Sequence, residues 1–168
     1  MKIEVIRERL VEAIQKAERV TSKNTTLPVL KCVLLEARSS SLFVRSTNLD
    51  IGLEIHIPAK VHTEGIVAVP GSVIASYLNQ LSGEKSVNLE HVDGSLKVTT
   101  SKNSTVIKTM SPDEYPSIPK VDKDTSKTFK IASRDLVSGL KAVWYSSSVS
   151  SIKAELSSVF VYQEDGSL

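Results

Sequence analysis

Apolar residues along the chain follow a repeated order of periodicities, which first appears in residues 1–57. Alternating apolar residues predict a strand at Lys2–Ile6, and apolar residues at helical spacing predict a helix from Arg7 to Thr21. Alternation and turn residues then predict three antiparallel strands, at Val29–Ala37, Leu42–Ser46 and Ile51–Ile57. This block is therefore predicted to be a strand, a helix and three strands.

The same order recurs in residues 65–109. A strand is predicted at Gly65–Val69, and Pro70 is typical of the start of a helix, which is predicted to run to about Leu81 and to end before Gly83. Three strands follow, at Val87–Val92, Leu96–Thr100 and Thr105–Thr109, the first two joined by the hairpin-turn pair Asp93-Gly94. Two such blocks predict one α+β domain, with tandem strand-helix-three-strand units, over residues 1–118.

The order begins again in residues 129–168, which repeat the apolar pattern of residues 3–42 at an offset of 126. Leu136 falls over Leu10, for example, whereas polar positions differ freely between the two copies. Agreement of the apolar positions alone indicates a repeated structural unit. Residues 119–128 have almost no apolar content and are interpreted as a linker. The last segment is then the incomplete opening of a second domain, and we expect the chain to be the N-terminal part of a longer protein.

Composition and charge narrow the class of protein. The chain is 40% hydrophobic with a mean hydropathy of −0.04, as in an ordinary globular protein. A net charge of +2 excludes a bulk basic field, so any basic surface must come from the placement of residues. The single cysteine, Cys32, excludes an internal disulfide. Glu4 and Arg7 interrupt any N-terminal signal sequence and no long apolar run follows, which predicts a cytoplasmic protein that binds no membrane.

Motifs for catalysis or metal binding are not found in the sequence. His56, His62 and His91 are scattered, without the spacing of metal ligands. Neither a phosphate-binding loop nor a nucleophile motif is present. Asp50 and Glu54 share a face of a predicted strand, but we interpret them as residues of a strand entry. The sequence therefore predicts a protein with no catalytic activity and no cofactor.

The exposed face of the first helix is basic. Arg9, Lys16 and Lys23 are seven residues apart and share this face with Glu12 and Arg19. One interpretation is a solvated face in which Glu12 and Lys16 form an ordinary ion pair. The other is a shallow surface that contacts phosphates without reading a base sequence. Polar residues elsewhere extend the second interpretation, namely Lys102 and Asn103 at a hairpin tip and Arg134 and Lys141 on the later helix.

Four segments, taken in order, resemble motifs of the bacterial DNA polymerase sliding clamps, the β subunits of replicative polymerases. Thr25–Leu30 is similar to the family's turn into the second strand, and Ser46–Gly52 to its Ala-Thr-Asp-Leu-Asp-Ile-Gly segment. Val69-Pro70 opens the second helix as in the family, and Pro112–Pro116 resembles the family's exit from the first domain. The resemblance covers all 168 residues. It implies a DNA-clamp fold, with antiparallel sheets outside and helices on one face.

The resemblance also implies a function and partners. Family members are rings of two three-domain subunits, a head-to-tail homodimer that encircles double-stranded DNA without sequence specificity and tethers the DNA polymerase. At the family's DNA-contacting loop this chain has Asn24 beside Lys23. The family's subunit interface corresponds to five residues, namely Val73, Tyr77, Leu81, Thr105 and Ile107.

The length of the chain changes what this resemblance predicts. Half of the second domain and the whole third domain are missing, and in the family the cleft for polymerase and clamp-loader peptides lies largely between those two domains. The chain alone is therefore expected neither to close a two-subunit ring nor to bind partner peptides in the family's way.

An alternative from another class is a small adaptor of the same fold, which uses its sheet edges for protein contacts and never encircles DNA. Duplex binding that depends on salt and is lost on neutralising Lys16, Arg19, Lys23 and Lys102 would favour the clamp. Indifference to those changes would favour the adaptor.

Overall fold

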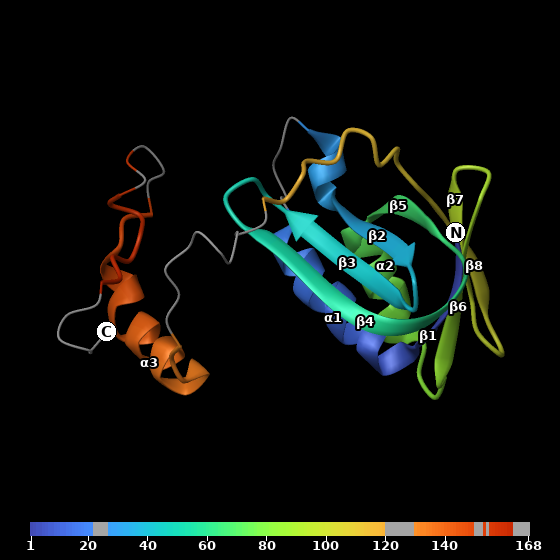
Figure 1. The fold of residues 1–168 in the computed structure, drawn as a ribbon, viewed down its shortest axis with the longest axis horizontal. Helices are drawn as coiled ribbons and strands as arrows, with labels where there is room; N and C mark the ends of the chain where they lie inside the picture. The colour runs from blue at the N-terminus through green and yellow to red at the C-terminus, as the bar shows by residue number, and fades with distance from the viewer. Residues whose placement is uncertain (22–26, 120–129, 150–152, 154, 163–168) are drawn as a thin grey trace. The chain divides into compact units, whose positions relative to one another are not determined.

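The computed structural model describes residues 1–21, 27–119, 130–149, 153 and 155–162 (Figure 1). The chain divides into two compact units, Met1–Lys120 and Val121–Leu168. Each unit is described by itself below. Lys23 and Asn24, together with the predicted linker from residue 120 onward, lie outside the described residues.

The first unit contains the predicted order of elements twice. The first half consists of β1 (Lys2–Ile6), α1 (Arg7–Val20), the 3-10 turn η1 (Pro28–Lys31), β2 (Cys32–Arg38), β3 (Ser41–Thr47) and β4 (Gly52–Thr63). The second half consists of β5 (Gly65–Pro70), α2 (Gly71–Gln80), β6 (Ser86–Val92), β7 (Ser95–Thr99) and β8 (Ser104–Lys108). The prediction of a strand, a helix and three strands in each half is confirmed.

Two element boundaries differ from the prediction by more than one residue, each for a local physical reason. The strand expected from Val29 begins only at Cys32, because Pro28 starts a 3-10 turn in which the Leu30 N–H donates to the Leu27 carbonyl at 3.1 Å. The strand expected to end at Ile57 continues to Thr63, because its second half pairs with β1. Neither cause is visible in the alternation of apolar residues.

The strands form one eight-stranded sheet in the order β5-β2-β3-β4-β1-β6-β7-β8. Every pairing between neighbouring strands is antiparallel. The first strand of each half pairs with a strand of the other half. β1 lies between β4 of its own half and β6 of the second half, and β5 pairs with β2 of the first half. Neither half therefore has a complete sheet of its own.

Both helices of this unit cover the same face of the sheet and enclose the core (Figure 1). From α1, the residues Leu10, Ala13, Ile14 and Ala17 are buried, and from α2 the side chains of Ile74 and Leu78 are buried. Burial of each large side chain contributes about 1.5–3 kcal/mol. Every second side chain of a strand points toward the helices, and these side chains complete the core. Leu89 and Leu96 are examples. The opposite faces of α1 and α2 are left to solvent.

The segment after β8, residues 109–119, contacts β5, β2 and β3 (Figure 1). The Met110 N–H donates to the Ala68 carbonyl on β5 at 2.9 Å. The Tyr115 hydroxyl lies 3.4 Å from the Cys32 carbonyl oxygen and 3.5 Å from that of Arg45. A small second cluster of buried residues, Val29, Cys32, Leu34 and Ala68, packs against Met110 and Tyr115. These contacts hold the segment on the sheet.

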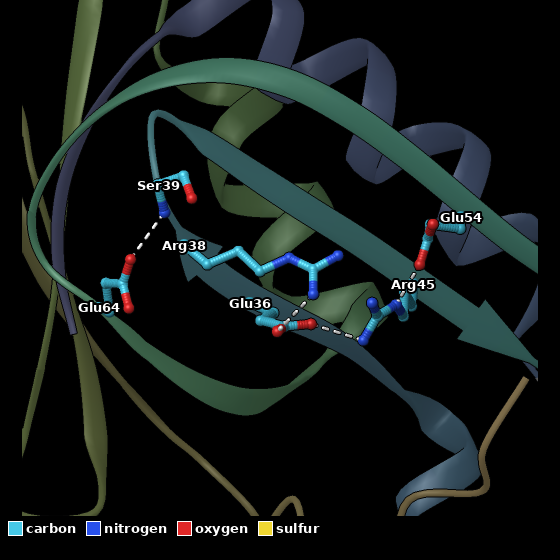
Figure 2. A network of polar contacts seen from close by, with 6 residues as sticks. All are labelled: Glu36, Arg38, Ser39, Arg45, Glu54 and Glu64. Atoms are coloured by element: carbon cyan, nitrogen blue, oxygen red, sulfur yellow. Dashed lines mark hydrogen bonds and ion pairs between the residues drawn. The ribbon is translucent and has the colours of Figure 1, made fainter.

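A charge network joins three neighbouring strands (Figure 2). Arg45 on β3 contacts Glu36 on β2 at 2.6 Å and Glu54 on β4 at 2.5 Å, and only 17% of its side chain is exposed. Arg38 contacts Glu36 at 3.7 Å and lies over the Phe43 ring at 4.1 Å. Arg45 is thus the centre of the network, because it neutralises two carboxylates on different strands.

The second unit contains the helix that the repeat predicts. Helix α3 spans Ser133–Val143 and continues into a 3-10 turn, η2, at Trp144–Ser146. The structure forms no strand among the described residues from 130 to 162, although the repeat expects strands near Leu156 and Val161. A strand requires neighbouring strands for stability, and none of the described residues of this unit forms one. That residues 129–168 open a second clamp domain stays a prediction.

Within the part of the chain that the structure describes, no helix is both long enough and apolar enough to span a bilayer.

Candidate nucleic-acid interface

Helix α1 presents the basic residues predicted for it. Arg9, Lys16 and Arg19 are all exposed, on the side of α1 opposite its buried residues. Lys16 Nζ contacts Glu12 Oε1 at 2.7 Å, and this hydrogen bond and charge lower the pKa of the Glu12 carboxyl. Both side chains are more than half exposed, so the ion pair is weak and can be exchanged for contacts with a phosphate. The two interpretations of this face are therefore compatible.

Helix α2 lies beside α1 and adds an uncharged polar surface. Gln15 Nε2 donates to Asn79 Oδ1 at 2.6 Å across the two helices. A shallow groove between them is lined by Gln15, Glu18, Arg19, Ser72, Ala75, Ser76 and Asn79. Sequence reasoning missed the residues from α2, although Ser72, Ser76 and Asn79 follow one another at helical spacing. Because α2 carries no charged residue, the two helices together form a polar and only weakly basic face.

The hairpin between β7 and β8 places Lys102 and Asn103 at its tip. The turn is closed by the Thr100 N–H, which donates to the Asn103 carbonyl at 2.8 Å. Next to it the Ser101 hydroxyl donates to the Glu84 carboxylate at 2.8 Å, which lowers the pKa of Glu84. Glu84 lies in the loop after α2, so the tip lies near the C-terminal end of that helix. Lys102 is exposed there, but the negative charge of Glu84 reduces the basic character of the tip.

The remaining predicted DNA-facing residues belong to the second unit. Arg134 and Lys141 lie on α3 and are both exposed. Asp135 follows Arg134 in the first turn of the helix, so the polar surface of α3 also carries both signs of charge. Their part in a DNA-binding surface stays a prediction.

The residues predicted for the subunit interface fall into two groups by the exposure of their side chains. Val73 is 49% exposed, and Tyr77 and Thr105 are half-buried. Leu81 and Ile107, by contrast, are only 3% and 6% exposed and pack in the core of their own unit. The side chains of these two residues pack within their own unit, and the assignment of all five residues to a subunit interface stays a prediction.

An exposed apolar residue next to this set was missed. Val106 lies between Thr105 and Ile107 on β8, and 64% of it is exposed. Alternation places the side chain of Val106 on the opposite face of the strand from its two neighbours. β8 is also the last strand of the sheet and pairs with β7 alone among the described strands.

Three of the residues considered for other chemistry, His56, Glu54 and Cys32, make contacts within the fold. His56 contacts the Phe43 ring edge-on at 4.3 Å between centroids, and Glu54 binds Arg45. Burial raises the pKa of the Cys32 thiol to about 11, which keeps it protonated at neutral pH. Among the described residues no cluster of three or more His, Cys, Asp or Glu side chains is arranged to hold a metal ion.

A strand-helix-three-strand unit occurs twice, and its two helices cover one face of the sheet with their polar sides outward. This arrangement is that of a sliding-clamp domain. The model of the DNA polymerase III beta subunit N-terminal domain matches residues 1–119. The chain belongs to the DNA polymerase III beta subunit family.

Relatives and solved structures agree with this assignment. The beta sliding clamp of Buchnera aphidicola subsp. Rhopalosiphum padi is 28% identical over 118 residues, covering 69% of this chain and 32% of that protein. The beta sliding clamp of Synechococcus elongatus is 23% identical over 169 residues, covering 99% of this chain and 44% of that protein. The chain thus spans less than half the length of these relatives.

Two crystal structures show the same fold. The DNA polymerase III subunit beta of Pseudomonas aeruginosa superposes with a TM-score of 0.85 at 20% identity, over 93% of this chain and 42% of that chain. The Helicobacter pylori beta clamp bound to a DNA ligase peptide superposes with a TM-score of 0.78 at 25% identity, over 92% of this chain and 43% of that chain.

Proposed function

We propose that this chain is the N-terminal part of a DNA-sliding clamp, a processivity factor that encircles duplex DNA and keeps the replicative polymerase on its template. Membership of the family supports the proposal, as does the polar helical face of the first unit. In this role α1 and α2 face the duplex and the sheet forms the outside of the ring. The observation that carries most weight is that every exposed basic residue of α1 lies on the side away from the core.

Weak charge suits a clamp that slides. α1 carries four basic and three acidic residues and α2 carries none, so the face attracts phosphates without holding them tightly. About four phosphate contacts would give a slope of about −3.6 in a plot of log binding constant against log salt. A ring holds DNA by its topology, and its inner surface has only to favour the DNA backbone.

The proposed partners follow from the same role. In the complete protein we propose a head-to-tail homodimer, with Val73, Tyr77, Thr105 and Val106 at the subunit interface. A polymerase and a clamp loader are the proposed protein partners, and the ligase peptide on the Helicobacter pylori clamp shows that one relative also binds a peptide from another enzyme. The protein acts as a non-catalytic subunit at the chromosome, and hence in the cytoplasm.

The adaptor hypothesis remains the second candidate. One observation favours it: β8 ends the sheet with an exposed Val106, and among the described strands only β7 pairs with it. An adaptor of this kind would bind proteins through the edge and would not retain DNA.

Retention on circular DNA tests the proposal. The protein from the complete gene is loaded on plasmid by its clamp loader, and retention at high salt is compared before and after linearisation. A clamp stays on closed circles and leaves linear DNA through its ends. Equal loss from both forms would overturn the proposal and favour the adaptor.

The basic face can be tested separately with matched variants. Lys16→Gln with Arg19→Gln is expected to lower the slope of salt dependence, because each lost phosphate contact changes it by about 0.9. Lys97→Gln is the control, because Lys97 is exposed on β7 while its neighbours Leu96 and Val98 point to the core. An equal effect of the control would show that the helical face is not the contact surface.

A further inference from the structure

Glu84 lies near Lys102, where a carboxylate is unfavourable for the proposed contact with DNA. Lys102 is exposed at the tip of the β7–β8 hairpin, and Glu84 lies in the loop between α2 and β6. A negative charge at this place repels the phosphates that Lys102 is proposed to contact. Glu84 therefore weakens the basic face unless it has a second role.

A hydrogen bond ties Glu84 to the hairpin tip. The Ser101 Oγ lies 2.8 Å from Oε2 and 3.1 Å from Oε1 of Glu84 and donates to this carboxylate. The turn itself is closed, because the Thr100 N–H donates to the Asn103 carbonyl and the Asn103 N–H donates to Thr100 Oγ1 at 3.1 Å. Thr100 is only 8% exposed. Lys102 lies inside this turn, so the position of Ser101 determines where the backbone of Lys102 lies.

The loop that carries Glu84 is in turn held by both helices. The Lys85 carbonyl accepts a hydrogen bond from the Arg7 N–H at 3.0 Å, at the first residue of α1. Arg7 Nη2 donates to the Leu78 carbonyl of α2 at 3.3 Å. A guanidinium is favourable there, because the C-terminal end of a helix carries a partial negative charge. A series of hydrogen bonds thus leads from the ends of α1 and α2, through residues 84 and 85, to the hairpin tip.

We propose that Glu84 is a positioning residue for DNA binding, which holds Lys102 beside the helical face through its hydrogen bond with Ser101. This role rests on the proposed function and adds to it a residue that does not itself touch DNA. A cation whose backbone is already held in place loses less conformational entropy when it binds a phosphate. This gain offsets the repulsion that the Glu84 carboxylate adds.

Two variants of Glu84 separate its effect on position from its charge. Glu84→Gln removes the charge but keeps an oxygen that accepts from Ser101, whereas Glu84→Ala removes both. If Glu84 acted through its charge alone, both variants would bind duplex DNA equally, and more tightly than the original protein. We expect instead that Glu84→Gln keeps the slope of log binding constant against log salt. Glu84→Ala is expected to reduce the size of this slope by up to about 0.9, the share of one phosphate contact.

Lys102→Gln shows whether Glu84 acts through Lys102. This variant alone is expected to reduce the size of the slope by about 0.9. In its background the difference between Glu84→Ala and Glu84→Gln is expected to disappear, because the cation to be positioned is absent. A difference that persists there would overturn the proposal, and so would a slope that Lys102→Gln leaves unchanged.

Glu64 provides the matched control at another turn. Its Oε1 accepts the Ser39 N–H at 2.7 Å, so this carboxylate also holds a turn, the one between β2 and β3 (Figure 2). Glu64→Gln and Glu64→Ala are expected to show the slope of the original protein, because no DNA-facing residue is proposed at that turn. Thermal unfolding followed by circular dichroism checks that every variant is folded. A fall with Glu64→Ala as large as that with Glu84→Ala would overturn the specific role of Glu84.

Fluorescence anisotropy gives the readout. The protein from the complete gene is titrated into a short fluorescent DNA duplex at a series of salt concentrations. Equal slopes for Glu84→Ala and Glu84→Gln would overturn the proposal. Retention on circular plasmid decides the clamp function separately. A protein that is retained on circles but shows equal slopes keeps the clamp function and loses this role of Glu84, whereas equal loss from circular and linear DNA removes both.

Discussion

Helices α1 and α3 occupy equivalent places in the repeat but have different surroundings. Ile14 and Ala17 of α1 are 0% exposed, whereas Leu140 and Val143, at the positions that align with them at the offset of 126, are 37% and 45% exposed. Both segments nevertheless form a helix of eleven residues or more. The comparison shows that the apolar period is sufficient to specify a helix, whereas burial depends on strands elsewhere in the sequence.

Truncation of the aligned pair gives the largest expected contrast. Ile14→Ala leaves a cavity in the core and is expected to lower the free energy of unfolding by about 2–5 kcal/mol. Leu140→Ala removes a partly exposed side chain and is expected to cost less than about 1 kcal/mol. Urea denaturation followed by circular dichroism measures both. Equal losses would mean that α3 is covered in solution as completely as α1.

Ion pairs show the same contrast between buried and exposed side chains. Arg45→Ala leaves Glu36 and Glu54 without their shared partner on neighbouring strands, and we expect a loss of about 2 kcal/mol. Arg38→Ala is the matched control, because its side chain is 44% exposed and lies 3.7 Å from Glu36. It is expected to cost less than about 0.5 kcal/mol. Thermal unfolding of both variants would reveal the difference, and a reversed order would contradict the role given to Arg45.

Alkaline pH tests the cluster beneath the segment after β8. Burial raises the pKa of Cys32 from 9.0 to about 11 and that of Tyr115 from 10.0 to about 12. The folded chain therefore holds these protons more tightly than the unfolded chain. Stability from Cys32 is complete below pH 9 and is lost as the pH rises from about 9 to 11, and that from Tyr115 is lost between about 10 and 12.

Each of the two groups is expected to contribute about 1–2 kcal/mol to this alkaline loss. Urea midpoints between pH 8 and 11 measure it. Cys32→Ala is expected to be less stable at every pH but to show a shallower fall above pH 9. Parallel curves for the two proteins would show that the thiol does not contribute.

The smallest expected effect concerns Lys16. Lys16→Gln breaks an exposed ion pair with Glu12 and is expected to leave the thermal midpoint almost unchanged. A weak role in folding leaves Lys16 available for the phosphate contact proposed for it. A clear fall of the thermal midpoint would assign the pair to the fold instead.

Periodicity predicted most of the fold because local spacing determines which face of an element is apolar. It did not predict how deeply Leu81 and Ile107 are buried, because both side chains join a core formed by residues from many parts of the chain. It also missed the charge network, because Glu36, Arg45 and Glu54 come from three strands whose register no local pattern reveals. The groove residues of α2 were missed since hydroxyl and amide side chains carry no net charge.

The exchange of β1 and β5 between the two halves has a consequence for biosynthesis. Ile3 pairs with Leu89, so the first strand to leave the ribosome cannot complete its pairing until β6 has been made. Such distant pairing slows folding relative to a fold with local contacts. The nascent chain must therefore hold its N-terminal residues in an unfinished state for most of the synthesis of this domain, which makes that stage the one at which a chaperone would be of most use.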